Sequence, residues 1–150
     1  MEQKKIRIGF IGTGGIAHSH MRAYLKRTDV EMVALCDIVP GKAEAFAKEF
    51  GIEGCVFYES HEKMLDTEVL DAVSVCTYNA QHAAPTIYAL NKGVNVLCEK
   101  PAARTYNEAL TMLEAQHKTG KVLNIGVVNR FNDGVNQIKK RIDAGELGEI

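Results

Sequence analysis

The chain has 150 residues, of which 46% are hydrophobic, and this is enough apolar material for the core of one ordinary domain. Its 18 Lys and Arg nearly balance 19 Asp and Glu, so the sequence lacks the basic stripe that a nucleic-acid partner requires, and we expect no such partner. No apolar run approaches the ~20 residues of a membrane helix, so we expect no interaction with a membrane.

Six strand-like apolar runs follow one another along the chain. They cover residues 6–11, 30–36, 56–58, 70–76, 94–98 and 122–128. Residues 1–5 lead directly into the first run without the features of a secretory signal, from which we expect a cytoplasmic protein.

Helical patterns separate the runs. The first pattern consists of Ile16, His20, Ala23 and Tyr24, and the second of Ala43, Phe46, Ala47 and Phe50. Pro40 is typical of a helix start and Gly51 of a helix end. Strict alternation of strands and helices predicts an α/β fold, a doubly wound, mostly parallel Rossmann sheet with helices on both faces. Ligands of such sheets bind at the carboxyl ends of the strands.

The helix after the fifth run carries clear boundary signals. Thr105 and Glu108 have the spacing of a capping box, and Gly120 is a typical helix end. The predicted buried stripe of this helix consists of Tyr106, Ala109, Leu110 and Leu113.

The end of the chain differs in kind from the rest. Residues 134–144 predict another helix, and residues 148–150 resemble the beginning of a further strand. We therefore expect one domain over residues 1–128, followed in residues 129–150 by a helix and an element in the middle of which the sequence stops.

A glycine-rich turn follows the first strand and opens the first helix. It reads Gly12-Thr13-Gly14-Gly15-Ile16-Ala17, a G-x-G-x-x-A pattern. The first Gly permits the tight turn, the second lets a pyrophosphate approach the backbone, and the Ala keeps helix and strand close. The free N–H groups and the dipole of the helix favour the anion. This pattern predicts a dinucleotide site.

An acidic residue at the end of the second strand strengthens that prediction. Asp37 lies near the ~20-residue offset at which a carboxylate accepts hydrogen bonds from the adenosine ribose. Its charge would repel a 2′-phosphate, and Ile38 and the residues after it offer no Arg, so NAD is favoured over NADP. Lys42 could still bind a phosphate. Alternatively, Asp37 is only a helix-capping or turn residue before Pro40.

Polar residues also follow the fourth, fifth and sixth strands, at the expected ligand edge. They are Thr77, Tyr78, Asn79 and His82, then Glu99, Lys100 and Pro101, and then Arg130. A cis Lys100–Pro101 bond could direct the Lys side chain into the cleft, although a lone Lys is more often a solvated charge. Arg130 could contact the nicotinamide or the substrate, or pair with Asp133.

The cysteines and the remaining histidines have simpler interpretations. Cys36, Cys55, Cys76 and Cys98 form no C-x-x-C pair, so we expect reduced, mostly buried thiols and no metal site. His20 lies on an apolar helix stripe, which favours a satisfied, partly buried side chain over a ligand. His61 lies at a short helix start beside Ser60, which suggests capping.

Taken in order, these residues resemble the glucose-fructose oxidoreductase / inositol dehydrogenase / MocA family of NAD(P)-dependent oxidoreductases. The resemblance rests on the glycine turn, Asp37, Thr77-Tyr78-Asn79-x-x-His82, Glu99-Lys100-Pro101, Asn129-Arg130-Phe131 and residues 145–150. The Glu-Lys-Pro triplet is the most specific of these motifs. Tyr78 departs from the family, in which Pro is common at that position.

The resemblance implies particular roles. Glu99 would contact the nicotinamide ribose, and Lys100 would lie near nicotinamide and substrate hydroxyl, as an electrostatic helper and acid/base. Gly12 to Ile16, Asp37, Ile38, the Thr77–Asn79 loop, His82 and Arg130 would complete the coenzyme contacts. Family members are much longer, and their C-terminal domain supplies further catalytic residues and most contacts between subunits. By this resemblance residues 1–128 would be the dinucleotide-binding domain, and residues 129–150 a connecting helix and the start of a C-terminal substrate domain that this chain does not contain. It follows that the parent protein would be a homo-oligomer and this fragment alone inactive.

The expected reaction is hydride transfer between a nicotinamide coenzyme and a sugar, inositol or related polyol. Two alternatives stay open. The chain could be a non-catalytic NAD(P)-binding module or sensor. It could also be an S-adenosylmethionine methyltransferase, which has a similar first loop but no evident use for Glu99-Lys100-Pro101.

Overall fold

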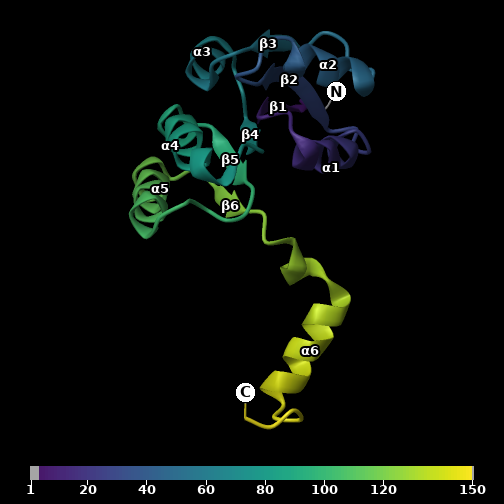
Figure 1. The fold of residues 1–150 in the computed structure, drawn as a ribbon, viewed down its shortest axis with the longest axis vertical. Coiled ribbons are helices and arrows are strands. Elements are labelled where there is room, and N and C mark those ends of the chain that lie inside the picture. The colour runs from purple at the N-terminus through teal and green to yellow at the C-terminus, as the bar shows by residue number, and fades with distance from the viewer. Residues whose placement is uncertain (1–3, 150) are drawn as a thin grey trace.

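A single six-stranded parallel sheet forms the centre of the molecule in this computed structural model, which describes residues 4–149 (Figure 1). The strand order is β3-β2-β1-β4-β5-β6, and every neighbouring pair is parallel. The strands are β1 (Ile6–Ile11), β2 (Val30–Cys36), β3 (Val56–Tyr58), β4 (Ala72–Val75), β5 (Asn95–Cys98) and β6 (Leu123–Ile125). This order confirms the predicted doubly wound Rossmann sheet.

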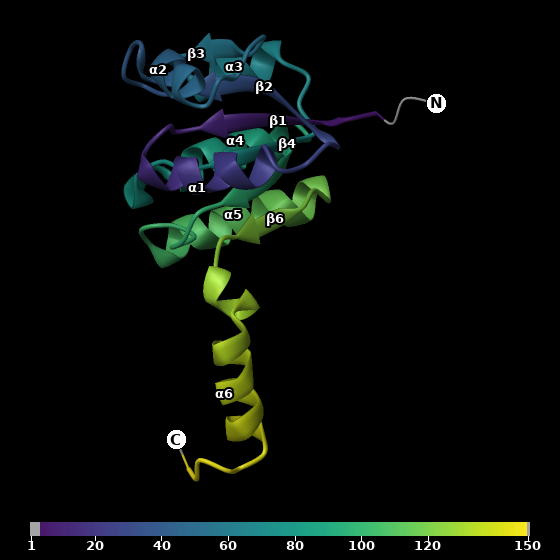
Figure 2. The same ribbon diagram turned by 90° about the vertical axis from the view of Figure 1, so that its right-hand side faces the viewer.

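Helices cover both faces of the sheet (Figure 2). The helices along the chain are α1 (Gly15–Tyr24), α2 (Lys42–Glu49), α3 (His61–Thr67), α4 (Ala83–Asn91), α5 (Tyr106–Thr119) and α6 (Asp133–Asp143), with short 3-10 helices η1 (Asn79–Gln81) and η2 (Val128–Phe131). Of these, α1 to α5 pack on the sheet. Met21 of α1 and Phe46 of α2 pack in one core cluster, whereas Met64 of α3, Leu90 of α4 and Met112 of α5 pack in the other. The sheet therefore separates two hydrophobic cores.

Three strands have the predicted bounds, and the other three are shorter. The largest difference is the sixth, predicted over 122–128 but ending at Ile125. β6 is an edge strand that pairs only with β5, and its last partner, Cys98, is the last residue of β5. Pairing therefore stops there, and Arg130 lies on η2 instead of at a strand end.

Two predicted helix stripes differ from the observed buried faces: the stripe of α5 is wrong, whereas that of α1 is right for His20 and Tyr24 and wrong for Ile16 and Ala23. On α1, Ala17 and Met21 are buried, whereas Ile16 is 42% exposed. On α5 the buried residues are Met112 and Ala115. The predicted α5 residues Tyr106, Leu110 and Leu113 are exposed, and Ala109 is half-buried. α5 packs mainly on α4, and the residues of α5 that this packing buries are Met112 and the small Ala115.

The final helix projects away from the sheet (Figures 1 and 2). It begins at Asp133, one residue before the predicted start, and the side chain of Asn132 caps it by accepting from Val135 N at 3.1 Å. All residues from 127 to 149 are exposed. Gly148 and Glu149 are not in a strand, contrary to prediction, and Ile150 lies outside the described residues.

Candidate functional site

The glycine turn after β1 has a backbone that only glycine fits at its first position. Gly12 has φ +90°, and a Cβ there would lie 2.8 Å from the carbonyl carbon and oxygen of Cys76. Gly14 and Gly15, by contrast, would carry a Cβ into open space, with no atom within 4 Å. Ala17 is fully buried, which brings α1 close to the sheet. The turn is therefore tight on its inner side and open where a ligand would approach.

The N-terminus of α1 suits an anion. Its N-cap is Gly14, which supplies no side-chain hydrogen bond, and its first turn contains no acidic residue. The first N–H groups of a helix have no partner within the helix and carry the positive end of its dipole. Backbone groups at this turn are thus suited to a pyrophosphate.

Asp37 lies beside this turn, at the end of β2. Its Oδ2 accepts hydrogen bonds from Thr13 N at 2.9 Å and Thr13 Oγ1 at 2.8 Å, and lies 2.8 Å from Lys42 Nζ. Its Oδ1 accepts from Val39 N at 3.1 Å. The N-cap of α2 is Gly41, so Asp37 does not cap that helix. The two parts of the predicted adenosine site therefore lie together at one edge of the sheet.

Asp37 is 6% exposed and is held as a carboxylate. Burial raises its pKa, but the hydrogen bonds from Lys42, Thr13 and Val39 lower it by more, so the pKa lies below the ordinary value. The neighbouring Ile38 is 67% exposed, at the surface beside the turn.

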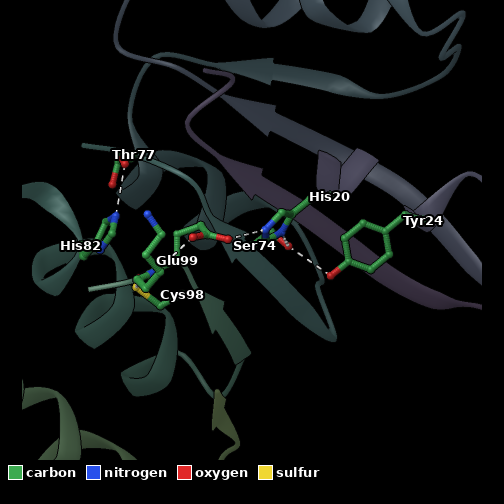
Figure 3. Close-up of polar contacts among 8 residues, drawn as sticks. His20, Tyr24, Ser74, Thr77, His82, Cys98 and Glu99 are labelled. Carbon is green, nitrogen blue, oxygen red and sulfur yellow. Dashed lines mark hydrogen bonds and ion pairs between the residues drawn. The ribbon is translucent and has the colours of Figure 1, made fainter. Parts of the chain in front are cut away.

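The loop after β4 lies in the middle of the same edge. Thr77 is half-buried, whereas Tyr78 is 81% exposed and Asn79 is exposed at the start of η1. His82 is only 1% exposed, and its Nδ1 lies 2.6 Å from Pro101 O and its Nε2 3.1 Å from Thr77 O (Figure 3). Both ring nitrogens of His82 are therefore used to connect the loops that follow β4 and β5.

The loop after β5 presents an acid and a base side by side. Glu99 is 5% exposed, and its Oε1 lies 2.9 Å from His20 Nε2. Its Oε2 accepts from Lys100 N at 3.1 Å. The side chain of Lys100 is exposed, and the Lys100–Pro101 peptide bond is cis.

Arg130 lies on η2, where it is exposed. Within residues 4–149 it forms no ion pair with Asp133 or with any other acid. The alternative of an Arg130–Asp133 pair is therefore wrong for this structure.

The cysteines behave as predicted. Cys36, Cys76 and Cys98 are buried free thiols, and Cys55 is half-buried. Burial raises the pKa of Cys36 and Cys76 to about 12 and that of Cys98 to about 11.

Across the described part of the chain, no three His, Cys, Asp or Glu side chains converge as metal ligands. None of its helices is long and apolar enough to cross a membrane.

Sequence reasoning missed two contacts of the site. It treated His20 as a satisfied histidine on an apolar stripe, and the structure pairs it with Glu99 across 79 positions of sequence. No local sequence pattern predicts the His20–Glu99 contact, because the contact depends on how α1 packs across the sheet. It considered Lys42 only as a phosphate ligand, although Lys42 follows Asp37 by only five residues and its opposite charge could have suggested the ion pair.

Comparisons with known proteins agree with this geometry. A sequence profile of the Gfo/Idh/MocA group, described as "Oxidoreductase family, NAD-binding Rossmann fold", matches residues 6–127. Inositol 2-dehydrogenase of Salmonella typhimurium is 36% identical over 146 residues, covering 96% of this chain and 43% of that protein. D-glucoside 3-dehydrogenase of Escherichia coli is 36% identical over 151 residues, covering 100% of this chain and 42% of that protein.

Solved structures show the same arrangement. The WlbA dehydrogenase from Bordetella pertussis, in complex with NADH and UDP-GlcNAcA, superposes with a TM-score of 0.88 at 29% identity, over 98% of this chain and 44% of that one. The chain thus spans less than half the length of the relatives it matches. The resemblance drawn from the sequence motifs is confirmed, and the chain belongs to the Gfo/Idh/MocA oxidoreductase family with an NAD-binding Rossmann fold.

Proposed function

We propose that residues 1–150 are the coenzyme-binding part of a longer dehydrogenase, which transfers a hydride between NAD and a hydroxyl carbon of a sugar, inositol or related polyol. The family membership supports this function, and so do the substrates in the names of the inositol and glucoside dehydrogenases it matches. The intact protein would be the active species.

The observation that carries the proposal is the position of Asp37. Its buried carboxylate touches Thr13 in the glycine turn, so the ribose-binding acid and the pyrophosphate-binding backbone form one continuous surface. The open space at Gly14 and Gly15 fits a pyrophosphate, because no side chain occupies it. These residues would hold the adenosine diphosphate half of the coenzyme.

Asp37 also favours NAD over NADP. A carboxylate at this place can accept from ribose hydroxyls and repels a 2′-phosphate. Lys42 neutralises part of that charge through its 2.8 Å ion pair, so we expect a preference for NAD and not complete exclusion of NADP.

The residues after β4 and β5 would serve the reacting half of the coenzyme. When bound, nicotinamide supplies the hydride chemistry. Tyr78 and Asn79 are exposed at this edge and would border the nicotinamide nucleoside. Glu99 would bind its ribose, and Lys100 would stabilise or relay the proton of the substrate hydroxyl. Arg130 would approach from η2.

We also propose that residues 1–128 form the coenzyme domain and that residues 129–150 lead to a separate substrate domain. Val135, Ile138 and Ile142 supply exposed apolar surface on α6 that such a domain would cover. The parent protein would then assemble as a homo-oligomer through that second domain.

Titration of the intact protein with NADH, NADPH and S-adenosylmethionine tests the ligand class, with nicotinamide fluorescence and thermal shift as readouts. We expect NADH to bind most tightly and Asp37→Ala to reduce its advantage over NADPH. Binding of S-adenosylmethionine alone, or of none of the three, would contradict the proposal.

Turnover with a panel of polyols then distinguishes an enzyme from a binding module. We expect Lys100→Ala to lower kcat by about 100-fold or more while changing NADH affinity little, because general acid–base groups contribute about that much to rate. Equal losses of both would contradict the role of Lys100, and absence of turnover despite tight NADH binding would favour the sensor alternative.

A further inference from the structure

A buried chain of polar side chains reaches from α1 to Glu99 (Figure 3). His20 Nε2 lies 2.9 Å from Glu99 Oε1, and these two side chains are 11% and 6% exposed. His20 Nδ1 lies 3.4 Å from Oγ of Ser74, a fully buried residue of β4. The same Oγ lies 3.1 Å from the hydroxyl of Tyr24. The chain thus joins three elements, α1, β4 and β5.

The chemistry of these groups indicates which one donates and which one accepts at each hydrogen bond. An ionised carboxylate only accepts hydrogen bonds, so His20 Nε2 donates to Glu99. In a neutral imidazole the second nitrogen is an acceptor, so His20 Nδ1 accepts from the Ser74 hydroxyl. Ser74 Oγ in turn accepts from Tyr24. The Glu99 carboxylate therefore requires the tautomer of His20 that carries its proton on Nε2, and the hydroxyls of Ser74 and Tyr24 can complete the hydrogen bonds of that tautomer.

The Glu99 carboxylate is bordered on its other sides as well. Its Oε2 accepts from the backbone N–H of Lys100 at 3.1 Å. A Cβ at Gly126 would lie only 3.0 Å from its Oε1, so the backbone after β6 approaches it closely. Fixing a side chain of this length costs rotamer entropy, which these contacts must offset.

The place of Glu99 in the sheet indicates what it would meet. Along the strand order, Asp37 follows β2, the glycine turn follows β1, and Glu99 follows β5, beyond β4. A dinucleotide with its ribose at Asp37 and its pyrophosphate at the glycine turn would therefore place its second nucleoside over β4 and β5.

We propose that His20 is a positioning residue for coenzyme binding. Its Nε2–H holds the Glu99 carboxylate in the orientation that binds the hydroxyls of the second ribose, and Ser74 and Tyr24 hold the His20 ring in place through its Nδ1 side. His20 acts through Glu99 and does not itself contact the coenzyme. The inference rests on the proposed function, because it assumes that NAD occupies this edge.

The test compares two variants of the intact protein. His20→Leu removes the donor, whereas His20→Gln keeps an N–H at a similar reach. We expect His20→Leu to raise the Kd for NADH and the KM for NAD about tenfold, as is typical for the loss of a hydrogen bond to a charged group. The kcat at saturating NAD should fall much less, and His20→Gln should recover most of the affinity.

A double-mutant cycle separates positioning from a general structural role. In the Glu99→Gln background, His20→Leu should weaken NADH binding far less than in the wild type, because its effect passes through the carboxylate. Tyr24→Phe is a milder variant that keeps the ring beside Phe10 and should give a smaller, equally Glu99-dependent loss. It also serves if His20→Leu does not fold.

The outcomes are distinguishable. If wild-type protein binds NADH and the variants bind it equally well, or if the losses are the same in both backgrounds, the positioning role is wrong. If wild-type protein does not bind NADH, the proposed function itself fails.

Discussion

Gly12 and Gly14, two residues apart in the same turn, have different reasons for being glycine. At Gly12 the backbone has φ +90° and the space beside it is filled by the Cys76 carbonyl, so the requirement is internal to the fold. At Gly14 the backbone has φ −80° and the space beside it is open, so folding alone does not require glycine. Under the proposed function, the requirement at Gly14 would come from the pyrophosphate of the coenzyme.

This difference predicts opposite phenotypes for one substitution. Gly12→Ala should destabilise the fold by about 3 kcal/mol, from backbone strain and overpacking. Gly14→Ala should leave the free energy of unfolding nearly unchanged and weaken NADH binding, because its Cβ enters the space for pyrophosphate. Urea unfolding and NADH titration measure the two effects. A stable Gly12→Ala protein with normal NADH affinity would contradict the account of the turn.

The Asp37 carboxylate predicts a pH dependence of stability. Its pKa is below the ordinary value because the bonds from Lys42, Thr13 and Val39 outweigh burial. Its contribution is therefore fully present above the unfolded-state pKa of about 4 and is lost as pH falls through the lower folded-state pKa.

Chemical unfolding between about pH 5 and pH 2 measures this contribution. The wild type should lose more stability over this range than Asp37→Asn, which has no carboxylate to protonate. Parallel stability curves for the two proteins would show that the Asp37 pairs contribute nothing to folding.

At the scale of elements, the two ends of α5 form as the residues beside them predict. Thr105 Oγ1 accepts from Glu108 N at 3.3 Å, and Glu108 Oε2 accepts from Thr105 N at 2.8 Å, which completes the predicted capping box. Gly120 ends the helix with φ +65°. Both ends of α5 are therefore determined by residues within or next to it.

Thr105→Ala should lower stability by about 1 kcal/mol and the Tm by about 2–4 °C, because it removes the cap. Thr111→Ala is a matched control in the same helix, since its hydroxyl only donates back to Asn107 O on the exposed side. Thermal unfolding followed by circular dichroism gives both values. Equal losses in the two variants would argue against the cap as the cause.

Elements with local causes could be predicted from the sequence, and elements with distant causes could not. Strands β1 to β3, the capping box and the α2 stripe follow from nearby residues, and all of them are confirmed. The buried sides of α1 and α5 depend on their packing partners, and the end of β6 depends on the end of β5. For the same reason Asp37 and Glu99 could be predicted to lie at one edge, whereas the His20–Glu99 contact could not.

At the scale of the whole molecule, the chain divides into a packed body and a projecting end. The two core clusters involve residues up to Ile125, and everything from 127 to 149 is exposed. Folding of the body therefore owes little to α6.

A variant that ends at residue 128 should melt within about 2 °C of the 150-residue chain, since surface residues without packing contacts change stability little. It should also associate less with itself, because the apolar residues of α6 are gone. Thermal unfolding and analytical ultracentrifugation measure the two effects. A large drop in Tm would show that α6 packs on the body in solution.

The chain leaves the sheet at Gly126, directly beside the Glu99 carboxylate. The segment that follows is therefore joined to the body at a glycine beside Glu99, where a Cβ would lie 3.0 Å from Oε1 of the carboxylate. Any side chain at residue 126 would require the Glu99 carboxylate to move by a few tenths of an ångström, so the glycine at the exit from the sheet leaves that carboxylate where His20 holds it.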